Sequence, residues 1–351
     1  MVGEAAVRAG CRYYFGYPIT PQNELPEYMS WRLPEIGGAF IQGESEIASV
    51  NMVMGASAAG GRVMTSSSSP GISLKLEAIS YMAGMELPAV IVNMMRGGPG
   101  LGNIAPSQAD YFQATKGGGH GDYHCLVLGP AGAQELADLT YQAFFLADQY
   151  RLPVMILGDG LIGQMMEPVV MPDMLDLSTL PAKDYILDGC KGRAKRVVYS
   201  YIPGPDDLYE HNMKLQRKYA DITRNETRFE TYKTDDADLV IVAYGTASRI
   251  AKGAVNELRA AGIKVGLFRP ISLWPFPKAA LRAVAEKVKT VCVFEMSAGQ
   301  MVEDVMLAVG TRAPLYFYGV PGGPVPTPDD IKAFIESVLA GDNKVGGKVD
   351  V

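Results

Sequence analysis

The chain has 351 residues, of which 48% are hydrophobic and 20% are charged, and its formal net charge is −6. This length and composition suit a globular protein of two ordinary domains and exclude a disordered or fibrous chain. The negative charge disfavours nucleic acid as a partner, because phosphate binding requires a basic surface. The longest apolar runs, such as residues 88–92 and 153–157, are too short to cross a bilayer. We therefore expect a cytoplasmic protein with no membrane partner.

Strand-like and helix-like segments alternate through the first 160 residues. The first ten residues contain an acid and a base, which favours a helix ending at Gly10 over a signal peptide. Apolar runs predict six strands, at Arg12–Phe15, Ala39–Gln42, Arg62–Ser66, Ala89–Asn93, Leu126–Leu128 and Val154–Leu157. Helices are expected between them, at Glu24–Leu33, Glu44–Ala59, Ile72–Met85 and Ala133–Tyr150. This alternation is typical of a parallel sheet covered by helices on both faces.

The second half of the chain has two parts. A proline-punctuated segment from Ile162 to Asp235 predicts little regular structure apart from a solvated helix in its charged part, Asp206–Thr231. After Asp235 a second alternation of strands and helices begins. We predict an α/β protein of two doubly wound domains, at residues 1–162 and 236–351, joined by a linker with a helix at 163–235.

The four cysteines are isolated in the sequence, at Cys11, Cys125, Cys190 and Cys292. None of them forms a C-x-x-C pair, so the sequence predicts neither a zinc site nor an iron–sulfur cluster in this chain. They are expected to be buried, reduced thiols. Any redox centre must then lie on another chain.

Three loops that follow predicted strands carry side chains suited to chemistry, since ligands of parallel sheets bind at the carboxyl ends of strands. The first loop, Gly16–Pro21, contains two prolines that stiffen it and hold the hydroxyl of Thr20 at a defined angle. A fixed hydroxyl there can hydrogen-bond a ligand. The alternative is that the prolines only lead into the next helix, which Pro21 would help to start.

The second loop leads into a helix and carries two carboxylates, Glu44 and Glu46. The buried face of that helix is expected at an apolar stripe, Ile47, Val50, Met54 and Ala58. At about 100° per residue, the carboxylates lie about 200° apart at opposite edges of the stripe, so at most one enters a given cleft. The alternative is that both only interact favourably with the helix N-terminus.

The third loop, Arg96–Asn103, contains four glycines, which let the backbone approach a ligand closely. The guanidinium of Arg96 can bind a carboxylate through two hydrogen bonds. The loop does not match the dinucleotide fingerprint, because Gly100-Leu-Gly102 is followed by Asn-Ile-Ala. The alternative is a mobile surface loop.

Two further segments are candidates. Thr65–Gly71 includes Ser67 and Ser68, whose hydroxyls either contact a cofactor or belong to a polar loop before a helix. His120 lies in a glycine-rich setting where it would titrate near neutral pH, and it is a further candidate site residue. Together with His124 it makes a poor metal site, because a third ligand is not evident. We predict no metal ligands in this chain.

Seven segments follow one another in the order of a known family, at Gly16–Pro21, Glu44–Asn51, Met64–Gly71, Arg96–Asn103, Gln113–Tyr123, Val242–Thr246 and Arg269–Pro277. With them the chain resembles the α subunits of the 2-oxoacid:ferredoxin oxidoreductases, most of all the branched-chain type that oxidises 3-methyl-2-oxobutanoate (2-ketoisovalerate). The resemblance implies a pyrimidine-binding thiamine diphosphate domain followed by a transketolase-C-terminal-like domain.

The resemblance also implies roles for single residues. Glu46 is similar to the family's carboxylate that hydrogen-bonds the aminopyrimidine ring of thiamine diphosphate. Thr20 and Arg96 resemble the hydroxyl and the arginine that bind the 2-oxoacid, so these three are the candidate catalytic residues. The candidate cofactor-binding residues are Pro18, Glu46, Ser67 and Ser68.

An enzyme of this family is active only with partner subunits. The implied reaction converts a branched-chain 2-oxoacid and coenzyme A into acyl-CoA, carbon dioxide and reduced ferredoxin. A β subunit would share thiamine diphosphate and hold Mg²⁺, while a γ subunit and a ferredoxin-like subunit with [4Fe-4S] clusters would serve external ferredoxin. The sequence is consistent with a diphosphate site on the β subunit. Gly158-Asp-Gly160 matches the start of the diphosphate-binding signature, but Leu187–Gly189 stand where its asparagine is required.

Three alternatives stay open at this point. The same machinery acting on 2-oxoglutarate would need an extra cation for the second carboxylate, and the three loops offer none. A non-catalytic scaffold subunit would only organise partners. A stand-alone nucleotide-binding enzyme is disfavoured by the missing phosphate loop.

Overall fold

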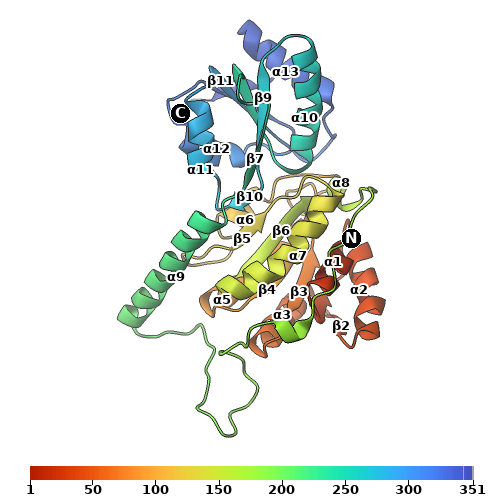
Figure 1. Cartoon of the computed structure of the whole chain (residues 1–351), viewed down its shortest axis with the longest axis vertical. Coiled ribbons are helices and arrows are strands. Elements are labelled where there is room, and N and C mark those ends of the chain that lie inside the picture. The colour runs from red at the N-terminus through yellow and green to blue at the C-terminus, as the bar shows by residue number, and fades with distance from the viewer. Residues whose placement is uncertain (343, 350–351) are drawn as a thin grey trace.

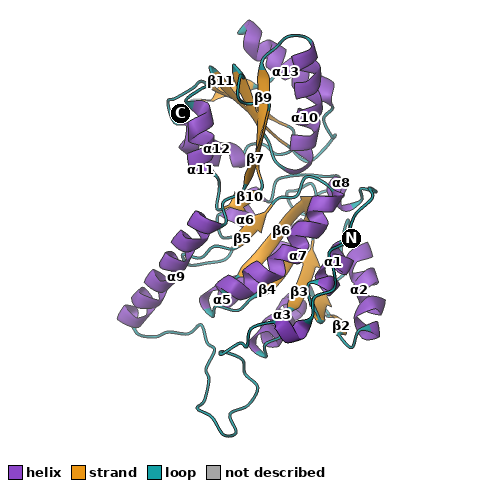
Figure 2. Cartoon of the chain, in the orientation of Figure 1, coloured by secondary structure: helices purple, strands orange, loops and turns teal. Residues whose placement is uncertain are grey.

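The computed structural model describes residues 1–342 and 344–349, which form two α/β units (Figures 1 and 2). The first unit is built on a seven-stranded sheet in the order β10-β5-β6-β4-β3-β1-β2. The second is built on a six-stranded sheet in the order β13-β12-β11-β8-β9-β7. Two α/β units with mostly parallel sheets confirm the predicted fold class.

Six strands of the first sheet are those predicted, shifted by at most two residues, and they pair in parallel. They are β1 (Tyr13–Gly16), β2 (Ala39–Gln42), β3 (Val63–Ser67), β4 (Ala89–Met95), β5 (Leu126–Leu128) and β6 (Pro153–Asp159). The central strands β3, β4 and β6 are buried along their whole length, which explains their unbroken apolar character. The seventh strand, β10 (Ser272–Trp274), comes from the second half of the chain and pairs antiparallel with β5. The sequence pattern did not predict this strand.

The helices of the first unit surround this sheet. They are α1 (Val2–Arg8), α2 (Glu24–Glu35), α3 (Glu46–Ala58), α4 (Ser69–Ser73), α5 (Leu76–Gly84), α6 (Tyr111–Thr115), α7 (Ala133–Tyr150) and α8 (Gly160–Gly163). Helix α1 packs against α7, and α3 packs against α5. The prediction of one helix over Ile72–Met85 was wrong, because the chain turns at Leu74 and Lys75 between two shorter helices.

The linker is irregular between α8 and α9 apart from a short 3₁₀ turn, η1 (Leu177–Thr179), and it forms the long green loop of Figure 1. Helix α9 (Pro205–Asn225) then leads to strand β7 (Phe229–Tyr232). The expectation of a solvated helix reaching Thr231 was therefore wrong in two respects. The helix ends before an edge strand that pairs antiparallel with β9, and one stripe of it is buried, at Leu215, Tyr219 and Ile222. Apolar residues four and three positions apart form one face even in a charged helix.

The second unit repeats the alternation at smaller scale. Its remaining strands are β8 (Leu239–Val242), β9 (Val265–Pro270), β11 (Thr290–Glu295), β12 (Leu315–Gly319) and β13 (Gly347–Val349). Its helices are α10 (Gly245–Ala260), α11 (Lys278–Ala285), α12 (Met301–Val309) and α13 (Pro328–Ala340). Over the described residues, no helix combines the length and the hydropathy that crossing a bilayer requires.

Gln108 is fully buried and connects the two units through hydrogen bonds. Its Nε2 donates to the carbonyl of Tyr244 at 2.8 Å, and its Oε1 accepts from the backbone N–H of Met296 at 2.9 Å. The backbone N–H of Gln108 also donates to the carbonyl of Met296 at 2.8 Å. One amide side chain thus provides hydrogen-bond partners for backbone groups that lie just after β8 and β11, two strands of the second sheet.

We predict that Gln108→Leu destabilises the chain. The substitution keeps the side-chain volume but leaves the Met296 N–H and the Tyr244 carbonyl buried without partners, which costs about 2 to 4 kcal/mol of the free energy of unfolding. Denaturant-induced unfolding measures the loss. The matched control is Gln164→Leu at an exposed position. Equal stability of the two variants would contradict the assigned role of Gln108.

Candidate active site

The loops that the sequence singled out meet at one edge of the first sheet. Strands β4, β3, β1 and β2 are neighbours in that order and run parallel, so their carboxyl ends lie side by side. Thr20 follows β1, Glu46 follows β2, and Arg96 follows β4. Side chains from distant parts of the sequence therefore lie along the same edge of the sheet.

Arg96 joins the first and the third of these loops. Its Nη1 donates to the carbonyl of Thr20 and its Nη2 to the carbonyl of Leu101, both at 3.0 Å. Its Nε is buried and has no hydrogen-bond partner. A guanidinium has five N–H donors, so this group retains the capacity to bind an anionic ligand after bonding to both carbonyls.

Hydrogen bonds hold the Arg96 loop in place, which argues against the alternative of a mobile surface loop. The backbone N–H of Gly97 donates to the carbonyl of Ala105, and that of Asn103 donates to the carbonyl of Gly97, both at 3.0 Å. The side-chain amide of Asn103 also donates to the carbonyl of Gly322 in the second unit, at 3.0 Å. Each connection restricts where the guanidinium can point.

Burial distinguishes the two carboxylates that helix geometry had left equivalent. Helix α3 begins at Glu46, because the hydroxyl of Ser45 caps it by accepting from the backbone N–H of Ala48 at 3.2 Å. Glu44 lies outside the helix and is exposed, whereas Glu46 is only 7% exposed. The geometric argument that placed both residues on one helix was therefore wrong.

The predicted buried stripe of α3 was also wrong in part. Ile47, expected to be part of it, is 49% exposed. The face that packs inward is rotated by one residue and is formed by Glu46, Ser49, Val50, Val53 and Ser57. The helix therefore turns a carboxylate inward and an isoleucine outward, against the general preference of these side chains.

Two serine hydroxyls at the end of β3 are buried, and that of Ser67 lies near this carboxylate. Ser67 Oγ and Ser68 Oγ are buried and have no hydrogen-bond partner. A Cβ atom added to Gly71 would lie 2.7 Å from Glu46 Oε1 and closer still to Ser67 Oγ, so these groups converge on the glycine. Buried hydroxyls are rarely left unpaired in a folded protein. The edge thus has the character of a cofactor cradle, because a carboxylate and an unpaired hydroxyl converge on a residue that has no side chain.

Two other predicted site residues are exposed. Pro18 lies in the loop after β1. His120 lies in its glycine-rich loop, 3.4 Å from Ser80 Oγ, with its ring edge-on to Tyr81 of α5. These contacts associate His120 with α5, whereas Glu46, Thr20 and Arg96 are associated with the ends of β1 to β4.

Sequence reasoning missed two polar residues near this edge. Gln22 is buried, accepts a hydrogen bond from Ser66 through Oε1, and leaves its Nε2 without a partner. Lys75, at the start of α5, is fully buried. The only signal in the sequence was the position of Lys75 between two leucines of an apolar helical segment.

In the Gly158-Asp-Gly160 segment, Asp159 caps a helix and connects the two units. Asp159 is buried at the end of β6, where its Oδ1 accepts from the backbone N–H groups of Leu161 and Ile162 at 3.0 and 3.1 Å. The same oxygen accepts from the hydroxyl of Thr246 in the second unit at 2.8 Å. Burial raises the pKa of the Asp159 carboxyl, and these donors oppose the shift. This carboxylate is thus occupied by helix capping and by the contact between the units.

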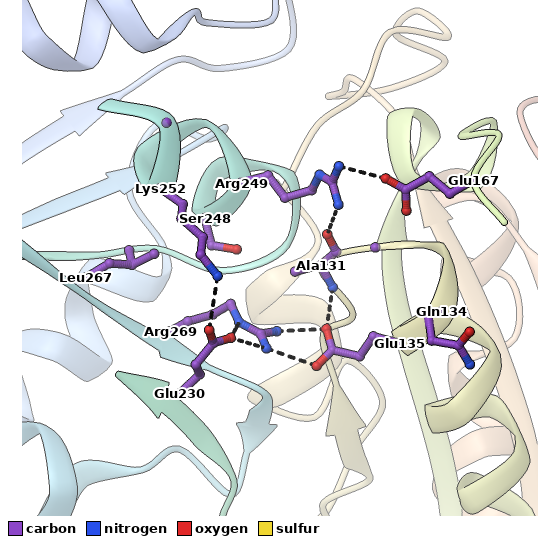
Figure 3. A pocket seen from close by; sticks show the side chains of 12 residues that line it. Ala131, Gln134, Glu135, Glu167, Glu230, Ser248, Arg249, Lys252, Leu267 and Arg269 are labelled. Atoms are coloured by element: carbon purple, nitrogen blue, oxygen red, sulfur yellow. Dashed lines mark hydrogen bonds and ion pairs between the residues drawn. The ribbon is translucent and has the colours of Figure 1, made fainter. Parts of the chain in front are cut away.

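A cleft of about 550 Å³ between the two units is lined by charged side chains (Figure 3). Its ion pairs are Arg269–Glu135 at 2.8 Å, Arg269–Glu230 at 2.7 Å, Arg249–Glu167 at 2.8 Å and Lys252–Glu230 at 3.3 Å. These acids and bases neutralise one another, so the cleft is an electrostatic contact between the units. The edge with the unpaired hydroxyls remains the stronger candidate site.

Among the described residues, the cysteines and acidic side chains form no metal centre. Cys11, Cys125 and Cys292 are buried, but Cys190 is exposed, so the expectation that all four thiols are buried was wrong. Within the described part of the chain, no three His, Cys, Asp or Glu side chains are grouped as metal ligands.

Comparison with known families gives two matches that together span most of the chain. Residues 4–228 match the family "Pyruvate flavodoxin/ferredoxin oxidoreductase, thiamine diP-bdg". Residues 237–331 match "Pyruvate:ferredoxin oxidoreductase core domain II". The first match contains every residue of the candidate site.

Among individual proteins, the chain is 53% identical to a ketoisovalerate oxidoreductase subunit VorB of Methanothermobacter marburgensis, over 88% of this chain and 87% of the relative. It is 40% identical to a 2-oxoglutarate synthase subunit KorA of Archaeoglobus fulgidus, over 86% of this chain and 88% of the relative.

Two solved structures share the fold. One is the 2-oxoglutarate:ferredoxin oxidoreductase of Magnetococcus marinus, solved with 2-oxoglutarate, coenzyme A and succinyl-CoA bound, at a TM-score of 0.85 and 27% identity. The match covers 96% of this chain but only 63% of that one. A split-gene transketolase matches with a TM-score of 0.60 at 17% identity, over 97% of this chain and 96% of that one, a likeness of fold alone.

We predict that Gly71→Ala destabilises the chain. Its new methyl group would collide with Ser67 Oγ and Glu46 Oε1, and overpacking of this kind costs about 1 to 3 kcal/mol of the free energy of unfolding. The matched control is Gly84→Ala, also in a helix, where an added Cβ meets no atom within 4 Å. Chemical denaturation compares them, and a loss in Gly84→Ala as large as in Gly71→Ala would refute the crowding at Gly71.

Proposed function

The chain belongs to the α subunits of the 2-oxoacid:ferredoxin oxidoreductases, and from this we propose that it carries the cofactor-activating and substrate-binding residues of a branched-chain 2-oxoacid oxidoreductase. The reaction is the oxidative decarboxylation of the 2-oxoacid with coenzyme A, which yields acyl-CoA, carbon dioxide and reduced ferredoxin. The observation that carries the proposal is the buried Glu46 carboxylate, which converges on Gly71 together with the unpaired hydroxyl of Ser67.

Glu46 is the proposed partner of the aminopyrimidine ring. A carboxylate and an unprotonated ring nitrogen are both hydrogen-bond acceptors, so a bond between them requires one shared proton. The unpaired hydroxyls of Ser67 and Ser68 can satisfy other polar atoms of the cofactor, and Pro18 offers an apolar surface at the same edge. When bound, thiamine diphosphate supplies the electron sink that decarboxylation of a 2-oxoacid requires.

Arg96 and Thr20 are the proposed substrate residues. The free donor capacity of the Arg96 guanidinium suits the carboxylate of a 2-oxoacid. Its bond to the carbonyl of Thr20 holds the Thr20 backbone beside the cation. We propose that this pair orients the 2-oxoacid above the cofactor position.

Partner subunits complete the proposed enzyme. A β subunit would provide Mg²⁺ and the diphosphate site, because Asp159 of this chain is already engaged as a helix cap and in the contact with Thr246. A γ subunit and a ferredoxin-like subunit would carry [4Fe-4S] clusters, since the cysteines of this chain are dispersed. Unpaired thiols persist in a reducing compartment, which fits the cytoplasm.

The preference for a branched-chain substrate is supported by the identity of 53% to a ketoisovalerate oxidoreductase subunit against 40% to a 2-oxoglutarate synthase subunit. The second carboxylate of 2-oxoglutarate would need another cation in the pocket. Lys75 lies near the site, but it is fully buried and its amine faces Thr65 and Ser66. The 2-oxoglutarate alternative is thus the weaker one, and a panel of 2-oxoacids tests it directly.

We predict that Glu46→Gln lowers substrate-dependent viologen reduction by the reconstituted complex by at least about a hundredfold, because an amide cannot share the proton with the ring. The matched control is Glu44→Gln, two residues away and exposed, which should keep the parent rate. Activity of Glu46→Gln close to that of the parent would refute the role of Glu46 and would favour a scaffold subunit.

We also predict that Arg96→Ala lowers kcat/KM for the 2-oxoacid by about tenfold to a hundredfold, the size expected when a charged hydrogen bond to a carboxylate is lost. The KM for coenzyme A should stay close to its parent value. Arg282→Ala, on an exposed turn of α11, is the control. An unchanged kcat/KM for the 2-oxoacid would remove Arg96 from the substrate site.

A further inference from the structure

Asp110 is an aspartate at the start of a helix that its side chain does not cap. It directly precedes α6, where an aspartate usually accepts a hydrogen bond from the backbone N–H of the second or third helical residue. Here Gln300 of the second unit takes that role, because its Oε1 accepts from the N–H of Phe112 at 2.7 Å. Its Nε2 also donates to the carbonyl of Ala109 at 2.6 Å. The Asp110 carboxylate is therefore available for contacts elsewhere.

The Asp110 carboxylate contacts two chain segments that carry the candidate site. Its Oδ2 accepts from the hydroxyl of Ser69 at 2.6 Å and from the side-chain amide of Asn93 at 2.9 Å. Ser69 is the first residue of α4 and directly follows the two serines whose hydroxyls are unpaired. Asn93 lies on β4, close before Arg96 in the sequence. One carboxylate oxygen thus connects the segment proposed for the cofactor with the strand that leads to Arg96.

Two backbone donors fix the directions of the hydrogen bonds in this cluster. The N–H of Ser69 donates to Asn93 Oδ1 at 3.2 Å, and the N–H of Arg96 donates to Ser69 Oγ at 3.0 Å. Because a backbone N–H can only donate, the Asn93 oxygen faces Ser69 and its amide N–H faces Asp110. Ser69 Oγ has one proton, and the carboxylate at 2.6 Å is a closer and stronger acceptor than the Arg96 carbonyl at 3.3 Å. Asp110, Ser69 and Asn93 therefore form a closed ring of hydrogen bonds, the Asp110 ring.

The Asp110 ring holds the main chain of Arg96 just beyond the end of its strand. Strand β4 ends at Met95, and the Arg96 N–H that follows has the Ser69 hydroxyl as its acceptor. Ser69 is 8% exposed and Asn93 is fully buried, so water cannot readily replace a lost partner. Without the Asp110 carboxylate, the Ser69 hydroxyl would turn towards the more distant Arg96 carbonyl, and the Asn93 amide would lose its acceptor. The contact that anchors Arg96 would then be free to shift.

We propose that Asp110 is a positioning residue for the 2-oxoacid, which acts through Ser69 on the main chain of Arg96. The inference rests on the proposed role of Arg96 and deepens it. The Ser69 hydroxyl, ordered by Asp110, accepts from the Arg96 N–H. From that anchored main chain the guanidinium reaches the carbonyls of Thr20 and Leu101. Asp110 thus sets the location of the guanidinium and does not itself bind the substrate.

The test is steady-state kinetics of the reconstituted complex at saturating thiamine diphosphate. Asp110→Ala should raise the KM for the 2-oxoacid and lower its kcat/KM by about fivefold to thirtyfold, because buried hydrogen bonds that hold a binding group are lost. The kcat should stay within about twofold of the parent value, since binding and not the chemical step is weakened. Asp173→Ala, at an exposed position in the linker, is the matched control and should keep the parent values. A parent-like KM for the 2-oxoacid in Asp110→Ala would overturn the inference.

Two further variants separate positioning from a direct effect of the charge. Asp110→Asn keeps an oxygen with two lone pairs, so it can accept from both Ser69 and Asn93 and should recover most of the lost kcat/KM. If Asp110→Asn loses as much as Asp110→Ala, the negative charge itself acts on the ligand and the positioning role is wrong. Ser69→Ala keeps the charge but removes the connection to Arg96, so it should match Asp110→Ala. Parent kinetics in Ser69→Ala would also overturn the inference.

A double-mutant cycle tests whether Asp110 acts through Arg96. In an Arg96→Ala background, the further change Asp110→Ala should lower kcat/KM for the 2-oxoacid by less than about twofold, because the group that Asp110 positions is absent. If the two losses multiply instead, Asp110 and Arg96 act independently and the inference is wrong.

The proposed role of Arg96 and this inference fail separately. An unchanged kcat/KM in Arg96→Ala would remove Arg96 from the substrate site and the inference with it. A lowered value in Arg96→Ala, combined with parent kinetics in Asp110→Ala and Ser69→Ala, would remove only the inference. Thermal unfolding of each variant complex checks that a raised KM does not reflect loss of the fold.

Discussion

Parallel pairing of β4, β3, β1 and β2 places four strand ends along one edge of the first sheet, and the candidate site depends on this arrangement. Backbone hydrogen bonds within the sheet hold it, whatever side chains stand at the edge. Arg96 and Thr20 are 76 positions apart in the sequence but in hydrogen-bond contact there. The loops can therefore hold the functional side chains, while the sheet stabilises the fold.

The same edge concentrates buried polar groups that the protein leaves unsatisfied. Nε of Arg96, Nε2 of Gln22 and the hydroxyls of Ser67 and Ser68 all lack hydrogen-bond partners. Each such group costs free energy, and departures of this kind are expected at functional sites more than elsewhere. Glu46 and Lys75 are two further ionisable side chains that are buried near this edge. A ligand that satisfied these groups would recover part of that cost on binding.

The second unit stabilises the site from outside. Gln108 satisfies backbone groups at the ends of β8 and β11, and Thr246 donates to Asp159 at the end of β6. Asn103 connects the Arg96 loop to the carbonyl of Gly322. Because these contacts reach the strand ends and the loop, the relative position of the two units is coupled to the geometry of the candidate site.

The sequence by itself determined the alternation of strands and helices, the two α/β units and the loops that carry Thr20, Glu46 and Arg96, because these follow from local propensity and from the order of motifs. It could not determine the antiparallel strands β7 and β10, whose pairing partners are distant in the chain. Only the tertiary structure decided that Glu46 is buried, that Glu44 is exposed and that Lys75 is buried in contact with β3. Burial depends on neighbours from other elements, and local sequence does not specify them.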